Sequence, residues 1–250
     1  MKKIIFLLCM FSFALPLMAA EDDDYDDETV IVADLSQIDI PTASTLEKYG
    51  FMFNSRLYSE GGTQMSIGFG LHDRLMLGAS FLFDGFIGNG SRVSMRDPEI
   101  QVKFRFFDGA DKKMPALALG YDGQGFFYDD NVKEYQEERR GLYLVGTYEL
   151  LKAFFVNAGV NISDFDNNHL FGFAGANYTL DKAITLMAEY DNLFHHSSSY
   201  ERLNAGVRLH ITTSFSLDVA VRGITNNGRY KSGLKRESER VMQLHYSAMF

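Results

Sequence analysis

The chain has 250 residues and a formal net charge of −9 at pH 7, with 22 Phe, 13 Tyr, 22 Gly and only 4 Pro. The acidic balance argues against binding to nucleic acid or anionic lipid through bulk charge, and the length suits one domain. Aromatic and glycine enrichment with few prolines favours many strands joined by turns. Beyond the first twenty residues no apolar stretch is long enough for a spanning helix, so a membrane role would depend on strands.

The first twenty residues, MKKIIFLLCMFSFALPLMAA, have the pattern of a secretory signal peptide. Lys2 and Lys3 precede an apolar run, and small residues end it, which predicts cleavage after Ala20. The run is too short for a spanning helix, and an acidic segment follows it. Cleavage removes Cys9, the only cysteine, and takes the formal net charge from −9 to −11. We therefore expect an exported mature protein without a disulfide.

Residues 21–47 are predicted to form an acidic N-terminal segment on the periplasmic side. Acids fill all but one position of EDDDYDDE (21–28), a run typical of a solvated tail. The alternative of a calcium-binding or partner-binding tail is less favoured, because calcium needs oxygen ligands held in a shaped loop and no glycine-turned loop is present. Residues 29–46 are more apolar, and either lead into the following domain or tuck inside it.

From residue 48 to the end, strand-like runs alternate with turns. We count twelve runs, at residues 49–59, 63–71, 74–84, 97–107, 114–122, 138–149, 152–162, 168–179, 183–192, 201–211, 214–223 and 240–250. Most alternate between apolar and polar side chains, which a strand places on opposite faces. In EIQVKFRFF (99–107), for example, the apolar residues share one face and the Glu, Gln, Lys and Arg share the other.

Three features favour a membrane barrel over a soluble sandwich. The runs are about ten residues long, the length that a tilted strand needs to span a bilayer. The polar face carries full charges and glycines, which suits a wet or ion-paired lumen better than a dry core. Tight connections such as LHDR, LLK, LDK and TTS alternate with long ones, as periplasmic turns alternate with external loops. We therefore expect an all-β fold, a single antiparallel transmembrane β-barrel of about twelve strands over residues 48–250, in the bacterial outer membrane.

The last ten residues, VMQLHYSAMF, indicate the closing strand. Apolar residues alternate with Gln243, His245 and Ser247, and the chain stops on Phe250. This pattern resembles the closing strand of bacterial outer-membrane barrels, whose terminal aromatic is read by the barrel-assembly machinery. The resemblance implies that Tyr246 and Phe250 form the assembly signal and that this machinery is a partner.

Five segments carry a further resemblance. They are DIPTASTL (39–46), PALALGYDGQG (115–125), LMAEYDN (186–192), LNAGVRL (203–209) and FSLDVAVRGI (215–224). They resemble a family of bacterial outer-membrane barrels grouped with the YjbH-type proteins, some of which are linked to exopolysaccharide production. The resemblance implies a Gram-negative cell envelope and a barrel fold. It implies no catalytic set, so none is carried over.

Inward-facing charges form the main candidate site. The positive candidates are Arg56, Lys103, Arg105, Arg208 and Arg222, and the negative candidates are Glu99, Glu149, Glu189, Asp191 and Asp218. A turn centred near Thr213 would place Arg208 opposite Asp218. Either these charges neutralise one another and fill the lumen, or they line a narrow aqueous path and tune its selectivity. The near balance of signs argues against strong ion selectivity.

Two long connections offer further binding chemistry. The aromatics Phe126, Phe127 and Tyr128 are assigned to the aromatic girdle at the membrane edge in preference to a sugar-stacking site. The last connection is basic, which suits either a solvated loop or contact with lipopolysaccharide phosphates. Its cations are Arg229, Lys231, Lys235, Arg236 and Arg240.

A hydrolase is the weakest hypothesis. His195 and His196 precede three serines at 197–199, but in a polar loop beside Asn192 that supplies no base held and oriented for a nucleophile. No metal-ligand spacing or phosphate loop appears, so we expect no cofactor, metal or enzymatic activity.

The sequence leaves two non-enzymatic functions open. One is a narrow channel or envelope protein for small polar solutes or glycan-related transport, with lipid, lipopolysaccharide and a polysaccharide or small solute as partners. The other is a closed structural or interaction barrel with a blocked lumen. A blocked lumen predicts that residues 29–46 pack inside the strands, whereas a pore predicts that they hang free.

Overall fold

The computed structural model describes residues 34–88, 93–110, 113–129, 133–163, 169–194, 201–224, 229 and 236–250. All of them belong to one compact unit, residues 31–250. The predicted signal peptide and the acidic run 21–28 lie outside the described residues. Within the described ranges, no helix is long and apolar enough to cross a membrane.

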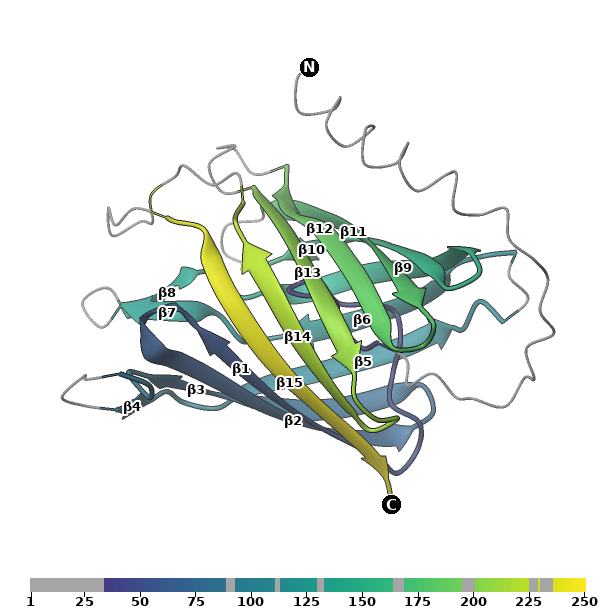
Figure 1. The fold of residues 1–250 in the computed structure, drawn as a ribbon, viewed down its shortest axis with the longest axis horizontal. Coiled ribbons are helices and arrows are strands. Elements are labelled where there is room, and N and C mark those ends of the chain that lie inside the picture. The colour runs from purple at the N-terminus through teal and green to yellow at the C-terminus, as the bar shows by residue number, and fades with distance from the viewer. Residues whose placement is uncertain are drawn as a thin grey trace. The chain divides into compact units, whose positions relative to one another are not determined.

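Twelve strands of the described residues form a closed antiparallel barrel (Figure 1). They are β1 (Gly50–Tyr58), β2 (Gly62–His72), β3 (Leu75–Asp84), β5 (Glu99–Phe107), β6 (Ala116–Asp122), β9 (Gly141–Leu151), β10 (Phe154–Ile162), β11 (Leu170–Leu180), β12 (Ile184–Leu193), β13 (Arg202–His210), β14 (Phe215–Arg222) and β15 (Glu239–Met249). Each pairs with the next along the chain, and β1 pairs with β15 to close the ring. The predicted fold is confirmed, and every predicted run overlaps one of these strands.

Four short elements lie in the connections between strands. A 3-10 turn, η2 (Ser59–Gly61), joins β1 to β2, and β4 (Ser94–Met95) pairs with the end of β3. Between β6 and β9 the chain forms a separate hairpin of β7 (Phe126–Asp129) and β8 (Glu134–Glu137). These additions all belong to the end of the barrel opposite the tight turns.

The described N-terminal residues and the C-terminus meet at the tight-turn end. The backbone N–H of Tyr49 donates to the carbonyl of Gly70 at 2.9 Å, next to the tight β2–β3 turn. The N–H of Phe250 donates to the carbonyl of Tyr49 at 3.2 Å. Residues 34–48 therefore enter the barrel from the end where the final strand stops.

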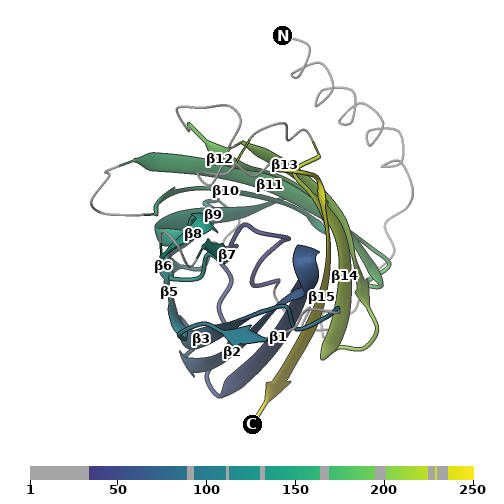
Figure 2. The same ribbon diagram turned by 90° about the vertical axis from the view of Figure 1, so that its left-hand side faces the viewer.

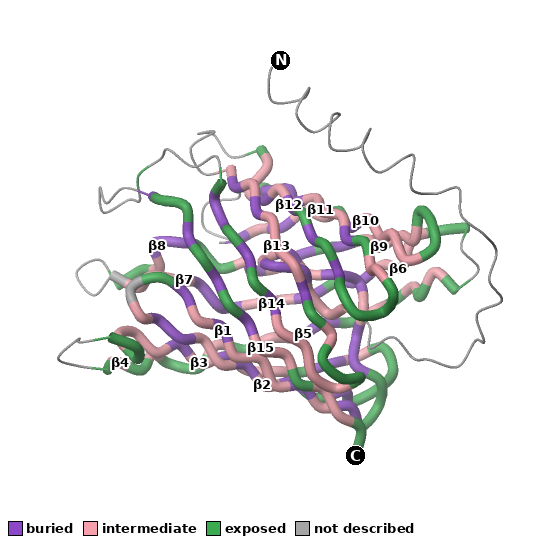
Figure 3. The backbone as a smooth tube through the Cα atoms, in the orientation of Figure 1, coloured by how far each residue is buried: buried purple, intermediate pink, exposed green. Residues whose placement is uncertain are grey.

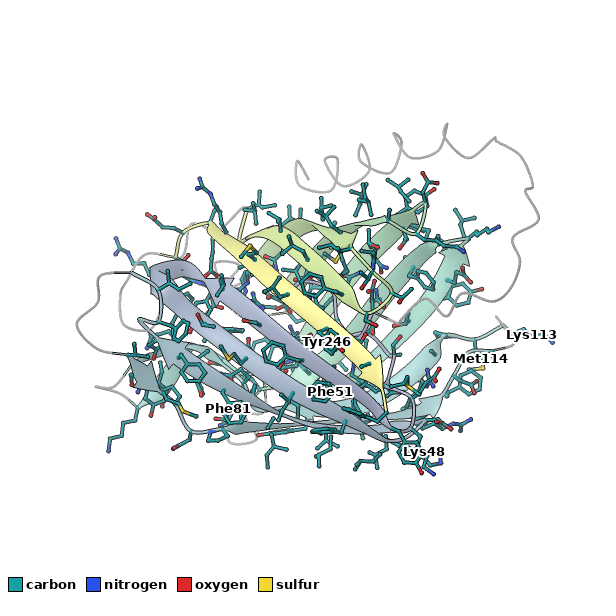
Figure 4. The ribbon with its side chains drawn as sticks, turned by 60° about the horizontal axis from the view of Figure 1, so that its bottom comes forward. Lys48, Phe51, Phe81, Lys113, Met114 and Tyr246 are labelled. Carbon is teal, nitrogen blue, oxygen red and sulfur yellow. The ribbon has the colours of Figure 1, made fainter. Side chains whose placement is uncertain are left out.

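The wall has an apolar outer face and a polar inner face. On β5, Ile100 and Phe104 are 59% and 45% exposed, whereas Lys103 between them is 5% exposed. The same alternation of exposed and buried residues runs along most strands (Figure 3), and Figure 4 shows Phe51 of β1 and Tyr246 of β15 on the outer surface. A soluble protein rarely exposes so much contiguous apolar surface. The arrangement is that of a barrel built to face lipid.

Candidate functional site in the lumen

Residues 34–46 lie inside the barrel, where Figure 2 shows their trace within the ring of strands. We call this segment the plug. Ile38 is 2% exposed, and Ile40 and Ala43 are fully buried. Ile40 and Ala43 pack in one cluster with Phe173 of β11. Residues 34–46 therefore pack inside the strands, as a blocked lumen predicts. The segment that hangs free, as expected for an open pore, is wrong for these residues.

A reverse turn gives the plug its shape. The N–H of Gln37 donates to the carbonyl of Ile40 at 2.9 Å, and the N–H of Thr42 donates to the carbonyl of Leu35 at 3.3 Å. Pro41 fits this turn because its ring fixes φ and it has no N–H to satisfy. The turn leaves the backbone N–H groups at its tip free to bind the barrel wall.

Glu189 of β12 binds that tip. Its carboxylate accepts hydrogen bonds from the N–H groups of Ile38, Asp39 and Ile40 at 3.2, 2.9 and 3.2 Å. The side-chain amide of Asn204 donates to the same carboxylate at 2.7 Å. Buried backbone donors need such partners, so Glu189 supports the plug by satisfying three of them.

Asp39 anchors the plug to β1 and β14. Its two carboxylate oxygens accept from Arg56 of β1 at 2.7 Å and from Arg222 of β14 at 2.7 Å. Asn204 also donates to it, at 3.1 Å. Burial works against the charged form, but the guanidiniums of Arg222 and Arg56 outweigh it and hold the pKa of the Asp39 carboxyl well below its ordinary value.

Arg208 of β13 forms a second anchor. It lies directly opposite Asp218 of β14, as the sequence predicts, and bonds both carboxylate oxygens at 2.7 and 2.8 Å. The same guanidinium pairs with Asp34 of the plug and donates to the carbonyl of Ser36 at 3.2 Å. A bidentate pair on the wall thus also holds the start of the plug.

Two more predicted charges contact the plug or its neighbours. The ammonium of Lys103 donates to the carbonyls of Leu35 and Ser44 at 2.8 and 3.0 Å. Asp191 of β12 pairs with Arg140 at 2.8 and 2.9 Å. Both side chains are buried in the lumen.

Arg105 and Glu149 lie nearer the tight-turn end. Arg105 donates to the carbonyl of Asp73 at 3.0 Å, in the β2–β3 turn. The carboxylate of Glu149 accepts from the N–H of Ala153 at 3.2 Å, in the β9–β10 turn. Both side chains therefore bind the tight turns at this end of the barrel.

The β7–β8 hairpin enters the lumen from the long-loop end (Figure 2). Its Glu137 is buried and accepts from Arg202 at 2.6 Å and from Arg222 at 2.8 Å. The same Arg222 guanidinium binds Glu239 at the start of β15. Burial opposes ionisation of Glu137, but the neighbouring guanidiniums hold the pKa of its carboxyl well below the ordinary value. Arg222 therefore joins the plug and the hairpin.

The aromatic girdle predicted for Phe126, Phe127 and Tyr128 is wrong. The ring of Phe126 lies 4.7 Å from the guanidinium carbon of Arg56. Phe127 meets the buried ring of Tyr58 edge-on, with centroids 5.4 Å apart, and Tyr128 meets the ring of Tyr135 edge-on within the hairpin, with centroids 5.2 Å apart. The physical reason is that buried guanidiniums and inward-facing rings offer these aromatics better partners than the membrane edge does.

Several residues of this network are absent from the predicted set: Asp39, Glu137, Arg140, Arg202 and Glu239. Arg202 and Glu239 have the same strand parity as neighbouring inward residues, so extending the alternation to the strand ends would have found them. Asp39 and Glu137 lie in the plug and in the β6–β9 connection, where strand periodicity gives no signal. Arg140 falls in the predicted run 138–149 but precedes β9, and its parity is opposite to that of the buried Tyr143 and Val145.

The plug does not fill the lumen. A cavity of about 170 Å³ remains beside it. Gln64, Ser66 and Gln101 line this cavity together with Arg56 and Lys103. The wall of β1, β2 and β5 is therefore mostly neutral and polar, with two cations.

No catalytic or metal centre emerges from the described residues. They contain no group of three or more His, Cys, Asp or Glu side chains placed to hold a metal ion. The loop with His195, His196 and the serines 197–199, on which the hydrolase hypothesis rests, lies outside the described residues, as do Lys231 and Lys235 of the basic loop.

Comparison with known proteins defines the class by its fold. No protein-family model and no curated protein matches the chain. Among solved structures, the barrel matches porins. The KdgM porin superposes with a TM-score of 0.54 at 12% identity, covering 79% of this chain and 98% of that one. The KdgM porin in complex with disordered oligogalacturonate gives a TM-score of 0.50 at 11% identity over the same shares. At such identities the likeness establishes the twelve-stranded porin-type fold.

Proposed function

We propose that this protein is a non-enzymatic outer-membrane channel for small polar solutes, closed by the plug in the conformation described above. The observation that carries the proposal is the inverted wall, apolar outside and charged inside, around a lumen that is occupied by a tethered segment of the chain. A barrel with a purely structural role in the membrane would need no cavity beside its plug.

The location follows from the same wall. Ten-residue strands with lipid-facing apolar side chains suit an outer membrane. The predicted signal peptide, and the predicted assembly signal at Tyr246 and Phe250, would bring the chain there through the barrel-assembly machinery. Tyr246 is 43% exposed and Phe250 is 84% exposed on the outer side of the closing strand. Lipid and lipopolysaccharide are the expected surroundings.

The solute class is proposed from three observations. The KdgM porin has been solved with oligogalacturonate, and the sequence resembles YjbH-type barrels, some of which are linked to exopolysaccharide. Polar uncharged side chains such as Gln64 and Gln101, which hydrogen-bond hydroxyl groups, line the cavity. Together these observations support a sugar-derived solute.

The contacts of the plug suit a reversible closure of the lumen. Two of the plug's anchors are the ion pairs of Asp34 with Arg208 and of Asp39 with Arg222, and both arginines also have acidic partners on the wall, Asp218 and Glu239. Removing the plug therefore leaves part of the wall network intact. This suits a gate better than a permanent core.

A second candidate is a closed interaction barrel. The observation in its favour is the density of buried contacts that join the plug, the hairpin and the wall through Arg222. In that case the plug never leaves, and the outer loops carry the function.

Conductance in a planar bilayer separates the two candidates. The mature chain from residue 21 and a version lacking 21–46 are refolded and compared. Openings that are rare in the first and steady in the second support the gated channel. Silence in both refutes the channel and leaves the interaction barrel.

A further inference from the structure

Arg56 depends on the plug for its acceptors. Its guanidinium donates to the Asp39 carboxylate at 2.7 Å and to the carbonyl of Ile38 at 3.4 Å. Among the described residues its other close partner is the ring of Phe126. Since both acceptors belong to the plug, withdrawal of the plug leaves Arg56 on the lumen wall without an anion.

Lys103 shows the same dependence from β5. Its two hydrogen-bond acceptors among the described residues are the plug carbonyls of Leu35 and Ser44. Asp122 of β6 acts on it through charge, but that carboxylate already accepts from Gln101 and from the N–H of Gln124. Withdrawal of the plug therefore exposes two cations against one acid on this wall.

The other anchoring cations differ. Arg208 keeps Asp218, Arg140 keeps Asp191, and Arg222 keeps Glu239 when the plug is absent. These wall pairs are neutralised by residues of the strands themselves. When the plug leaves, the cations that lose their acceptors are therefore Arg56 and Lys103.

We propose that Arg56 and Lys103 form two separate binding positions for the carboxylates of an acidic sugar, and that Asp39 occupies the first and the plug carbonyls the second while the lumen is closed. Because this inference names the solute class of the channel, it rests on the proposed function. Gln64 lies opposite Arg56 in the β1–β2 register, and Gln101 is two residues from Lys103 on the same face of β5. Each cation thus has a neighbouring amide that can bind a sugar hydroxyl.

Because solute and plug compete for the same cations, a carboxylate sugar should promote plug release. The plug has the advantage of being tethered, so its effective concentration is high and millimolar solute is needed to displace it. A neutral sugar with the same ring lacks the carboxylate and therefore forms no ion pair with Arg56 or Lys103.

The test uses the full mature chain, which has no cysteine once Cys9 is removed with the predicted signal peptide. Ala43→Cys places a thiol on a fully buried plug position, and a membrane-impermeant maleimide measures how often it becomes accessible. We expect saturating glucuronate to raise the labelling rate about tenfold, which corresponds to about 1.4 kcal/mol. Glucose is expected to leave the rate unchanged.

Three variants in the Ala43→Cys background assign the effect. The double variant Arg56→Gln, Lys103→Gln should label faster without sugar and should ignore glucuronate. Arg56→Lys keeps the charge and should keep the response. Lys182→Gln, which removes a charge from the exposed β11–β12 turn, should behave as the parent does. Heat-modifiable migration in gel electrophoresis selects folded protein in each case.

Equal rates with glucuronate and glucose would overturn the inference, as would a glucuronate response that persists in the double glutamine variant. A folded chain that never labels also overturns it, because the site then stays covered. The outcome is independent of conductance. Glucuronate-dependent labelling in a barrel that carries no current supports the binding site while the channel fails.

Discussion

Replacing Gly175 with alanine is expected to weaken the docking of the plug without changing any charge in the lumen. Gly175 faces the lumen from β11, and an added Cβ would lie 2.1 Å from Oε1 of Gln37 and 2.6 Å from Cδ1 of Ile40. Real Cβ atoms essentially never come within 3.0 Å of another heavy atom. The nearest wall atom, the carbonyl oxygen of Ala188, lies at 3.1 Å, so the clash falls on the plug.

The size of the effect follows from overpacking. Inserting a methyl group into a packed site costs about 1–3 kcal/mol. The two contacts below 3.0 Å exist only in the plugged state, because Gln37 and Ile40 leave the site with the plug, whereas the 3.1 Å contact with the Ala188 carbonyl is common to both states. The equilibrium between closed and open barrels should therefore shift by about 5- to 150-fold.

Single-channel recording measures this shift as open probability. Gly146→Ala is the matched control, since an added Cβ there has no contact nearer than 3.3 Å, to a leucine side chain on the neighbouring strand. We expect a raised open probability in Gly175→Ala and the parent value in Gly146→Ala. Equal open probabilities in the parent and Gly175→Ala would refute the assignment of the plug contacts.

Further predictions concern the anchors and the chain ends. Because the pKa of Asp39 is depressed in the folded protein, its stabilising contribution is present above the ordinary carboxyl pKa and is lost only as the pH falls through the lowered value. Acidification from about pH 7 to pH 5 should therefore leave the Asp39 carboxyl ionised and paired with Arg56 and Arg222; a protonation shift of the Asp39 carboxyl signal in NMR spectra over that range would contradict the assignment. Glu137→Gln should weaken docking of the hairpin by about 3–5 kcal/mol, seen as faster proteolysis within residues 126–137, and an unchanged cleavage rate would count against its role. Phe250→Ala should lower the heat-modifiable fraction in isolated outer membranes if the terminal aromatic is an assembly signal, whereas full assembly would remove that role. N-terminal sequencing of the exported protein should begin at Glu21, and any other start would move the predicted cleavage site.

The strands could be predicted because the information is local. Along β12, Ile184, Leu186 and Ala188 are exposed while Thr185 and Glu189 are buried. A period of two within a few residues is sufficient to assign both faces of such a strand. The tight turns then determine the pairing of neighbouring strands, as the opposition of Arg208 and Asp218 illustrates.

The plug contacts could not be predicted because they are long-range. Asp39 binds Arg222, which is 183 positions away in the sequence, and Glu189, which binds the same turn, is 150 positions from Asp39. No local period encodes such a partner. The inward turn of Phe126 was missed for a related reason: an aromatic-rich connection suits the membrane edge and a lumen rich in arginine equally well.

Amide hydrogen exchange across residues 37–43 tests the central claim most directly. In the plugged barrel the N–H groups of residues 37–40, 42 and 43 all have acceptors, which include Glu189 and the hydroxyl of Thr147. The account predicts that these amides exchange as slowly as those of the barrel strands. Exchange at the rate of an exposed chain, with the strands still protected, would contradict it.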